Sequence, residues 1–237
     1  MKEYFLQEEN PFSIFSSEHF LGLFTMCVLF AGIIYLSRKY LNERQQRSFG
    51  FILALSTTIG LLLRTYIYYR LGTFTILDGL PLYICRLLTF VVPFLMWNKN
   101  KMLFGILYFW VLAGTSQALL TPDLKFGFPH YESIFYWQIH GGLVLVILYA
   151  VLVYGMKPSW QDCKNAFYAG VVYLISVHLI NIALGSNYAY TMHKPPGGSI
   201  LDLMGPWPWY LLTGLGVSVL LFGLLYLPFA VSRKNKN

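Results

Sequence analysis

Long runs of apolar residues follow one another along the chain, separated by short segments rich in polar and charged residues. A helix needs about 20 mostly apolar residues to cross the hydrocarbon core of a bilayer. Seven segments meet this requirement, at residues 19–37, 48–67, 80–97, 101–120, 134–154, 165–185 and 207–229. They lack the alternation of a membrane β-strand, and backbone groups in lipid must be paired internally, so each run predicts a helix. We therefore expect an all-α polytopic membrane protein in which residues 1–237 form one seven-helix domain.

The composition supports the bilayer as the solvent of this chain. Hydrophobic residues make up 57% of the 237 residues and charged residues 11%, whereas a soluble domain carries roughly 25% charged residues. This excludes a soluble globular domain, a disordered chain and a disulfide-stapled secreted domain. The net charge of +7 does not indicate nucleic-acid binding, because the basic residues are dispersed over short loops. The cysteines, Cys27, Cys85 and Cys163, lack metal-ligand spacing, so we expect no structural disulfide, metal or cofactor.

The loops differ in their content of basic residues, and this difference predicts the orientation. Cytoplasmic loops of membrane proteins carry an excess of Lys and Arg. One side of the predicted bundle carries Arg38, Lys39, Arg44, Arg47, Lys99, Lys101, Lys157, Lys164, Arg233, Lys234 and Lys236. The other side carries only Lys2, Arg70, Lys125 and Lys194. We therefore expect the N-terminus outside and the C-terminus in the cytoplasm.

Few polar side chains lie within or at the edges of the spans, and we expect them in the outer half of the bilayer. They are Arg64, Cys85, Arg86, Gln117, His140, His178 and Asn181. At a rise of about 1.5 Å per residue, Cys85, His140 and His178 lie roughly 8 to 10 Å below the outer ends of their spans. An ionisable residue at this depth is costly to insert and indicates a function. The clustering predicts a polar cavity that opens outward beneath the long loops at residues 121–133 and 186–206.

Each of these polar residues also has a purely structural interpretation. A cysteine in a span often packs as a small apolar residue, and a histidine can join two helices by a hydrogen bond. His178 and Asn181 share one helix face at i and i+3, which is typical of an interhelical clamp. Arg64 and Arg86 can extend to lipid phosphates. His19 follows two serines, one of which we expect to cap the first helix.

Cys85 and His140 together favour a sharper hypothesis. A thiol is a modest nucleophile until a nearby histidine or positive charge yields the thiolate. An imidazole at a similar depth in another helix can supply that activation. Arg86 adjoins Cys85 in sequence and is about 100° away around the helix, so it adds positive potential without having to face the same cavity.

Four segments carry a resemblance to a known family. They are SNYAYTMHKPPGGSILDLMGPWPWY before and into the last span, FSSEHF at the first, LPLYICRL at the third, and the run from TPD through FYWQIHGG into the fifth. The chain resembles the YwaF-like bacterial membrane proteins, which are related to the eukaryotic transmembrane-protein-164 family. The resemblance covers nearly the whole chain, and its Asn-Tyr, Lys-Pro-Pro and Gly-Pro-Trp-Pro-Trp-Tyr elements are specific.

The eukaryotic relatives are regarded as phospholipid acyltransferases that use an intramembrane cysteine. The resemblance therefore implies a lipid acyltransferase in the cell membrane, with a membrane phospholipid as substrate. The LPLYIC motif places the nucleophile on Cys85, and the QIH motif places the base on His140. Water in place of the acceptor makes the same machinery a lipase. The remaining polar residues are expected to stabilise an oxyanion (Gln117, His178 and Asn181) or to bind lipid phosphate (Arg64 and Lys194, with Arg86 in the same cavity).

A small-solute transporter is the main alternative. Pro93 in the third span and the Gly141–Gly142 pair in the fifth favour broken helices, which transporters use. Against it, no internal repeat is evident and the polar residues are shallow. A retinal protein is excluded because the last span lacks a lysine. Soluble-type motifs such as HExxH, GxSxG and the P-loop are missing.

Overall fold

The computed structural model describes residues 10–195 and 199–234, and of residues 232–234 it describes the backbone alone. Its longer helices, in chain order, are α2 (Ser17–Tyr40), α3 (Glu43–Arg70), α4 (Ile84–Asn98), α5 (Lys101–Trp110), α6 (Ser116–Leu120), α7 (Tyr131–Leu152), α8 (Trp160–Leu184) and α9 (Trp209–Lys234). A π-helical segment, Val111–Thr115, joins α5 to α6. Two short 3-10 helices, Tyr188–Tyr190 and Ile200–Met204, lie between α8 and α9.

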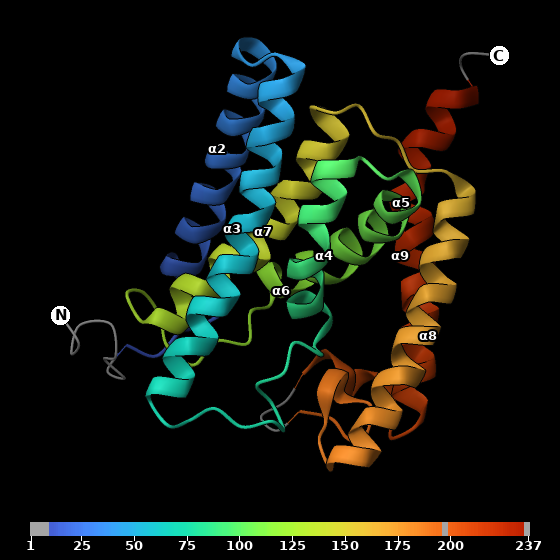
Figure 1. Cartoon of the computed structure of the whole chain (residues 1–237). Coiled ribbons are helices and arrows are strands. Elements are labelled where there is room, and N and C mark those ends of the chain that lie inside the picture. The colour runs from blue at the N-terminus through green and yellow to red at the C-terminus, as the bar shows by residue number, and fades with distance from the viewer. Residues whose placement is uncertain (1–9, 196–198, 235–237) are drawn as a thin grey trace.

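The helices run up and down the bundle in alternation, so the loops sort to its two ends (Figure 1). The connections α2–α3, α4–α5 and α7–α8 are short and lie at one end. The loops that follow α3, α6 and α8 lie together at the opposite end, which we call the loop end. This is the arrangement that the apolar pattern predicts. The side of the membrane that each end faces remains a prediction.

Six helices of the described chain are long and apolar enough to cross a membrane, and α4 is shorter. The predicted third span, residues 80–97, is therefore corrected: α4 begins at Ile84, and Leu80–Tyr83 form turns. Figure 1 shows α4 starting well inside the bundle, short of the level at which α3 and α8 reach the loop end. Cys85 is thus the second residue of a helix that begins in the bundle interior. The similar depths expected for Cys85 and His140 were counted from the outer ends of the predicted spans, and the later start of α4 removes that basis for Cys85.

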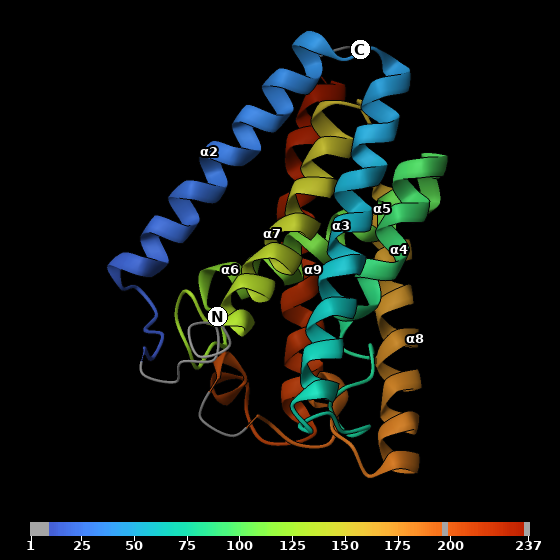
Figure 2. The same cartoon turned by 60° about the vertical axis from the view of Figure 1, so that its left-hand side comes forward.

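The most buried side chains come mainly from α4, α5 and α7, which form the centre of the bundle. Examples are Val92, Leu95, Phe104, Leu143 and Ile147, each with no exposed surface. The outer helices α2, α8 and α9 each expose many large apolar side chains. Figure 2 shows α2 leaning away from the other helices toward the loop end. We expect lipid to cover these exposed apolar faces, which surround the buried centre of the bundle.

Polar residues cap the N-termini of three of the long helices. Ser16 caps α2 by accepting a hydrogen bond from the His19 backbone N–H, as expected for one of the two serines there. Asn42 and Ser159 begin α3 and α8 with capping boxes. These caps satisfy backbone N–H groups that have no partner within a helix.

Pro93 does not break α4, contrary to the interpretation that favoured a broken helix. A proline cannot donate a hydrogen bond to the carbonyl four residues earlier, here that of Thr89. The Thr58 hydroxyl of α3 donates to that carbonyl at 2.6 Å instead. The free backbone group is satisfied by a neighbouring helix, as membrane helices require. The helix irregularity lies elsewhere, in the π-helical segment Val111–Thr115 of the fourth span.

Candidate functional site

The loop that leads into α4 is held by two tyrosines from distant parts of the chain. The Tyr188 hydroxyl donates to the Ile76 carbonyl at 2.5 Å and accepts from the Leu80 backbone N–H at 3.0 Å. Tyr173 of α8 donates to the Leu82 carbonyl at 2.7 Å. Burial raises the pKa of the Tyr188 phenol, so it keeps the proton that it donates. Irregular backbone within a membrane bundle is tolerated where protein satisfies its polar groups or where it lines a cavity.

Cys85 lies in the first turn of α4, where the helix leaves backbone donors free. The first hydrogen bond within the helix runs from the Leu87 N–H to the Tyr83 carbonyl. The N–H groups of Ile84, Cys85 and Arg86 precede it and have no acceptor within the helix. Tyr83, at the N-cap position, supplies no side-chain cap. The Cys85 thiol therefore lies beside backbone donors that can stabilise a developing negative charge.

The π-helical segment provides the hydrogen-bond partner of this thiol. The Cys85 Sγ and the Thr115 Oγ1 are 3.5 Å apart. Thr115 is fully buried and ends the segment Val111–Thr115. Single π-helical turns inside α-helices are rare and occur often at functional sites.

One ring nitrogen of His140, Nδ1, forms a hydrogen bond, and the other, Nε2, forms none within the described residues. Its Nδ1 donates to the Tyr136 carbonyl of the preceding turn at 2.9 Å. This bond fixes the neutral tautomer in which Nε2 carries the lone pair. Within the described chain, Nε2 has no hydrogen bond. The imidazole lies against the Tyr136 ring, with centroids 4.1 Å apart.

Cys85 and His140 do not form a hydrogen bond with each other in the described structure. Cys85 and His140 belong to helices that pack against each other, α4 and α7, and the pairing of their side chains remains a prediction.

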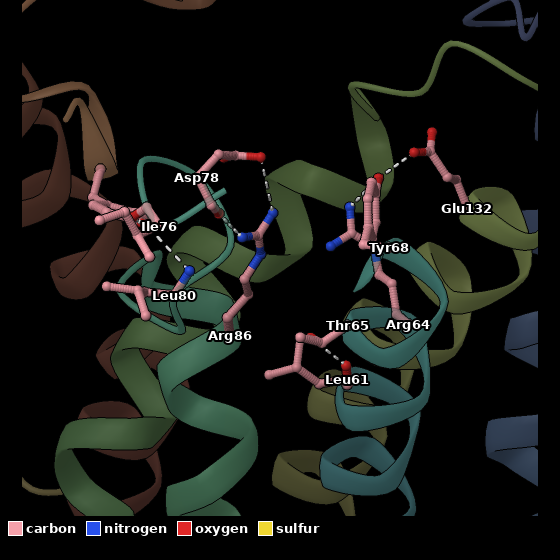
Figure 3. Close-up of polar contacts among 10 residues, drawn as sticks. Leu61, Arg64, Thr65, Tyr68, Ile76, Asp78, Leu80, Arg86 and Glu132 are labelled. Carbon is pink, nitrogen blue, oxygen red and sulfur yellow. Dashed lines mark hydrogen bonds and ion pairs between the residues drawn. The ribbon is translucent and has the colours of Figure 1, made fainter. Parts of the chain in front are cut away.

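The two span arginines, Arg64 of α3 and Arg86 of α4, line one recess (Figure 3). Arg64 donates to the Tyr68 hydroxyl at 2.8 Å, and Tyr68 in turn donates to Glu132 at the start of α7. Arg86 donates to the Asp78 carbonyl and lies 4.0 Å from the Asp78 carboxylate. Figure 3 shows the arginines on opposite sides of the recess, with Glu132 on the far side of Tyr68.

His178 and Asn181 bind the loop after α8 rather than a neighbouring helix. Asn181 donates to the Tyr188 carbonyl and to the Thr191 hydroxyl, each at 2.8 Å. Its Oδ1 accepts from the Ser186 hydroxyl at 2.7 Å and from the Tyr188 N–H at 2.8 Å. His178 Nδ1 lies 3.2 Å from the Thr191 hydroxyl. The hydrogen-bonding groups of Asn181 are therefore used to shape this loop, which leaves none of them for an oxyanion.

The other predicted residues lie toward the loop end. Lys194 pairs with Asp202 at 3.4 Å within the loop after α8. Gln117 is exposed on α6. His19 is fully buried, accepts at Nδ1 from the Phe15 N–H and donates at Nε2 to the Leu119 carbonyl at 2.9 Å. It satisfies a carbonyl at the end of α6 and so fixes α2 to that helix.

Several residues of the site were not predicted from the sequence. Tyr68 and Tyr136 each lie one turn from a predicted residue, Arg64 and His140, and that spacing is a usable signal. Asp78 lies in the loop just before the LPLYIC motif. Thr115 has no signal, because nothing in the surrounding sequence marks a π-turn.

These observations first define a class of protein. An all-α bundle, with six long apolar helices among the described residues and lipid-type exposed faces, is an integral, multi-pass membrane protein. The model of the TMEM164 family matches residues 14–226, and the chain therefore belongs to that family. An "Uncharacterized protein" of Treponema pallidum (strain Nichols) is 25% identical over 180 residues, which cover 72% of this chain and 74% of that protein. No solved structure matches the chain with statistical significance.

Proposed function

We propose that this protein is a lipid acyltransferase of the cell membrane in which Cys85 carries the acyl group as a thioester. The observation that carries the proposal is the position of the Cys85 thiol in the first turn of α4, inside the bundle, beside backbone N–H groups that have no helical acceptor. The resemblance of the LPLYIC segment to membrane acyltransferases points to the same residue. The recess lined by Arg64 and by Arg86, the residue that follows Cys85 in the chain, supports a phospholipid as donor.

In the first half-reaction, the Cys85 sulfur attacks the ester carbonyl of a donor phospholipid. A carbon–sulfur bond forms while the thiol proton passes to Nε2 of His140. The backbone N–H groups of Ile84 and Cys85 stabilise the oxyanion of the tetrahedral intermediate. The ester carbon–oxygen bond then breaks, and the departing oxygen takes the proton from His140. The products are a lysophospholipid and the Cys85 thioester.

The second half-reaction reverses these steps on a different alcohol. Nε2 of His140 accepts the proton of the acceptor hydroxyl, whose oxygen attacks the thioester carbonyl. A new ester bond forms, the carbon–sulfur bond breaks, and the proton returns to the sulfur of Cys85. A Cys85–His140 distance that shortens when lipid binds is part of this proposal, because catalytic hydrogen bonds often tighten only in the substrate complex.

The proposal is tested with purified full-length protein in vesicles that contain a phospholipid with isotopically labelled acyl chains and an unlabelled lysophospholipid. We expect labelled acyl groups on the acceptor, and an acyl adduct on the intact protein that hydroxylamine removes. Cys85→Ala removes both signals, whereas Cys163→Ala, a change at the buried cysteine of α8, leaves both. His140→Ala lowers the rate by about 10²–10⁴-fold.

Three outcomes separate the alternatives. Acyl transfer that survives in Cys85→Ala refutes the proposed nucleophile. Release of free fatty acid in place of transfer makes the protein a hydrolase with the same nucleophile. Unchanged lipids together with solute flux into the vesicles favour a transporter.

A further inference from the structure

The recess between α3 and α4 has the lining of a small anion site. It encloses about 290 Å³ of empty space, counted out to its open mouth. The end of α3 forms one wall, the loop after α3 forms the cover, and Arg86 of α4 faces Arg64 from the other side (Figure 3). Both guanidinium groups line this one recess, so two positive charges share it. Two arginines held toward one space are stabilised by an anion between them.

Arg64 lacks a counter-ion in the described chain. Its one side-chain hydrogen bond goes to the Tyr68 hydroxyl, and its guanidinium lies 4.4 Å from the centre of the Tyr68 ring. The Tyr68 hydroxyl in turn donates a hydrogen bond to the Glu132 carboxylate, which does not line the recess. The remaining N–H groups of Arg64 are therefore available to a ligand. A guanidinium presents its donors as a planar fork, which fits phosphate oxygens.

Arg86 is only loosely neutralised. Its ion pair with the Asp78 carboxylate spans 4.0 Å, and the Asp78 side chain is 66% exposed, against 18% for Arg86. Two arginines and one carboxylate leave the recess with one net positive charge. A phosphodiester, which carries one negative charge, balances it.

The position of the recess gives it access to lipid. Leu62, Leu63 and Tyr66, which flank Arg64 on α3, are 54%, 49% and 55% exposed. This part of α3 thus presents apolar and aromatic side chains to its surroundings, as helices do near the headgroup layer. Arg64 lies six residues before the end of α3, or about 9 Å along the helix axis. A phosphate in the headgroup layer is within reach of such a side chain.

We propose that this recess binds the phosphate group of a membrane phospholipid between Arg64 and Arg86. Arg86 follows Cys85 directly in the chain, and in a glycerophospholipid only a few bonds separate the phosphate from an ester carbonyl. A lipid whose phosphate lies at the recess therefore has an ester carbonyl within reach of the first turn of α4, which carries the Cys85 thiol. This last step rests on the proposed acyltransferase function, whereas the phosphate site itself does not.

The test measures lipid binding to the full-length protein in detergent by native mass spectrometry. The probes are dioleoyl phosphatidylglycerol, dioleoylglycerol, which lacks the phosphate, and inorganic phosphate. We expect phosphatidylglycerol to bind and Arg64→Gln to weaken this binding about tenfold to a hundredfold, as for the loss of a charge-assisted hydrogen bond. Arg64→Lys keeps the charge without the planar fork, and we expect an intermediate loss.

Arg70→Gln is the matched control. Arg70 belongs to the same helix and also bonds a tyrosine one turn away, at 2.9 Å to the Tyr66 hydroxyl, but it is exposed and outside the recess. We expect Arg70→Gln to bind phosphatidylglycerol as the wild type does, with both variants melting at the wild-type temperature. Equal losses in Arg64→Gln and Arg70→Gln, or no loss in Arg64→Gln, overturn the proposal. Arginine-dependent binding of inorganic phosphate without binding of phosphatidylglycerol also overturns it, in favour of a soluble anion.

Cys85→Ala separates this proposal from the acyltransferase mechanism. The change removes the thiol and leaves both arginines, so we expect phosphatidylglycerol binding within twofold of the wild type and sensitive to Arg64→Gln. If that binding persists while no variant alters acyl transfer, the phosphate site stands and the proposed chemistry falls. If acyl transfer depends on Cys85 while Arg64→Gln changes neither binding nor KM, the phosphate site falls alone.

Discussion

Replacement of Asn181 by alanine tests whether the loop after α8 is held from within the bundle. The side chain is fully buried and makes four hydrogen bonds, with the Ser186 hydroxyl, both backbone polar groups of Tyr188 and the Thr191 hydroxyl. Side-chain hydrogen bonds contribute about 0.6 kcal/mol each in membrane proteins and about 1 kcal/mol in soluble ones. Asn181→Ala should therefore lower the free energy of unfolding by about 2–4 kcal/mol.

The effect should be concentrated in the loop and measurable there by hydrogen exchange. Alanine leaves the Tyr188 backbone N–H without its acceptor at 2.8 Å. A local loss of 1.4 kcal/mol accelerates exchange tenfold, so we expect at least about a tenfold increase at this amide. Because Tyr188 also holds Ile76 and Leu80, the loop before α4 should exchange faster as well.

Asn165→Ala provides the comparison on the same helix. Asn165 accepts one exposed hydrogen bond, from Gln161 at 3.0 Å, and its replacement should change stability by no more than about 0.5 kcal/mol. Unchanged protection of the Tyr188 amide in Asn181→Ala would show that the four bonds do not determine the path of this loop. A loss spread evenly over the bundle would assign Asn181 to general packing.

Three further predictions concern orientation, helix packing and pH. A reporter fused to the C-terminus should be active only in the cytoplasm, because basic residues gather in the loops of that side; activity outside would reverse the orientation. Thr58→Val should cost about 0.5–1.5 kcal/mol by removing the donor to the Thr89 carbonyl. The loss should shrink in a Pro93→Ala background, where a backbone N–H is restored, and an additive double-mutant cycle would contradict this. Hydrogen bonding by the Ser199 backbone N–H lowers the pKa of Asp202. The ionised carboxylate therefore stabilises the folded loop above its ordinary pKa of about 3.9, and this stabilisation is lost as the pH falls through the lowered pKa. The rate of proteolysis of the loop should rise as the pH falls through this range, and Asp202→Asn should abolish the pH dependence.

Most of the bundle could be predicted from hydrophobicity because a long apolar run has few alternatives in a membrane. The exception is the start of the third span. Residues 80–83 are as apolar as the helix that follows, yet they form turns whose polar groups bond Tyr173 and Tyr188. Hydropathy measures the cost of leaving water and cannot distinguish a helix from a turn whose backbone is satisfied by distant side chains.

The polar residues of the candidate site could be predicted from the sequence, whereas the side chains that contact them could not. Polar residues inside spans are rare enough to be noticed one by one, which led to Arg64, Cys85 and His140. Their neighbours depend on how helices face each other, and a single sequence does not contain that information. Asn181 illustrates the difference: its i, i+3 spacing with His178 is correct as a shared contact with Thr191, but that contact lies in the loop after α8 rather than in another helix.

The tyrosines that satisfy the loop before α4 also constrain the order in which the protein can be assembled. The backbone groups of Ile76, Leu80 and Leu82 are synthesised about a hundred residues before the hydroxyls that bond them, at Tyr173 and Tyr188. A nascent chain that has inserted only its first five spans therefore has no permanent partners for this loop, and the N-terminal turn of α4 has no fixed place. Cys85 reaches its final surroundings only after α8 and the following loop have left the translocon. The surroundings of this thiol are thus completed only when the rest of the bundle is in the bilayer.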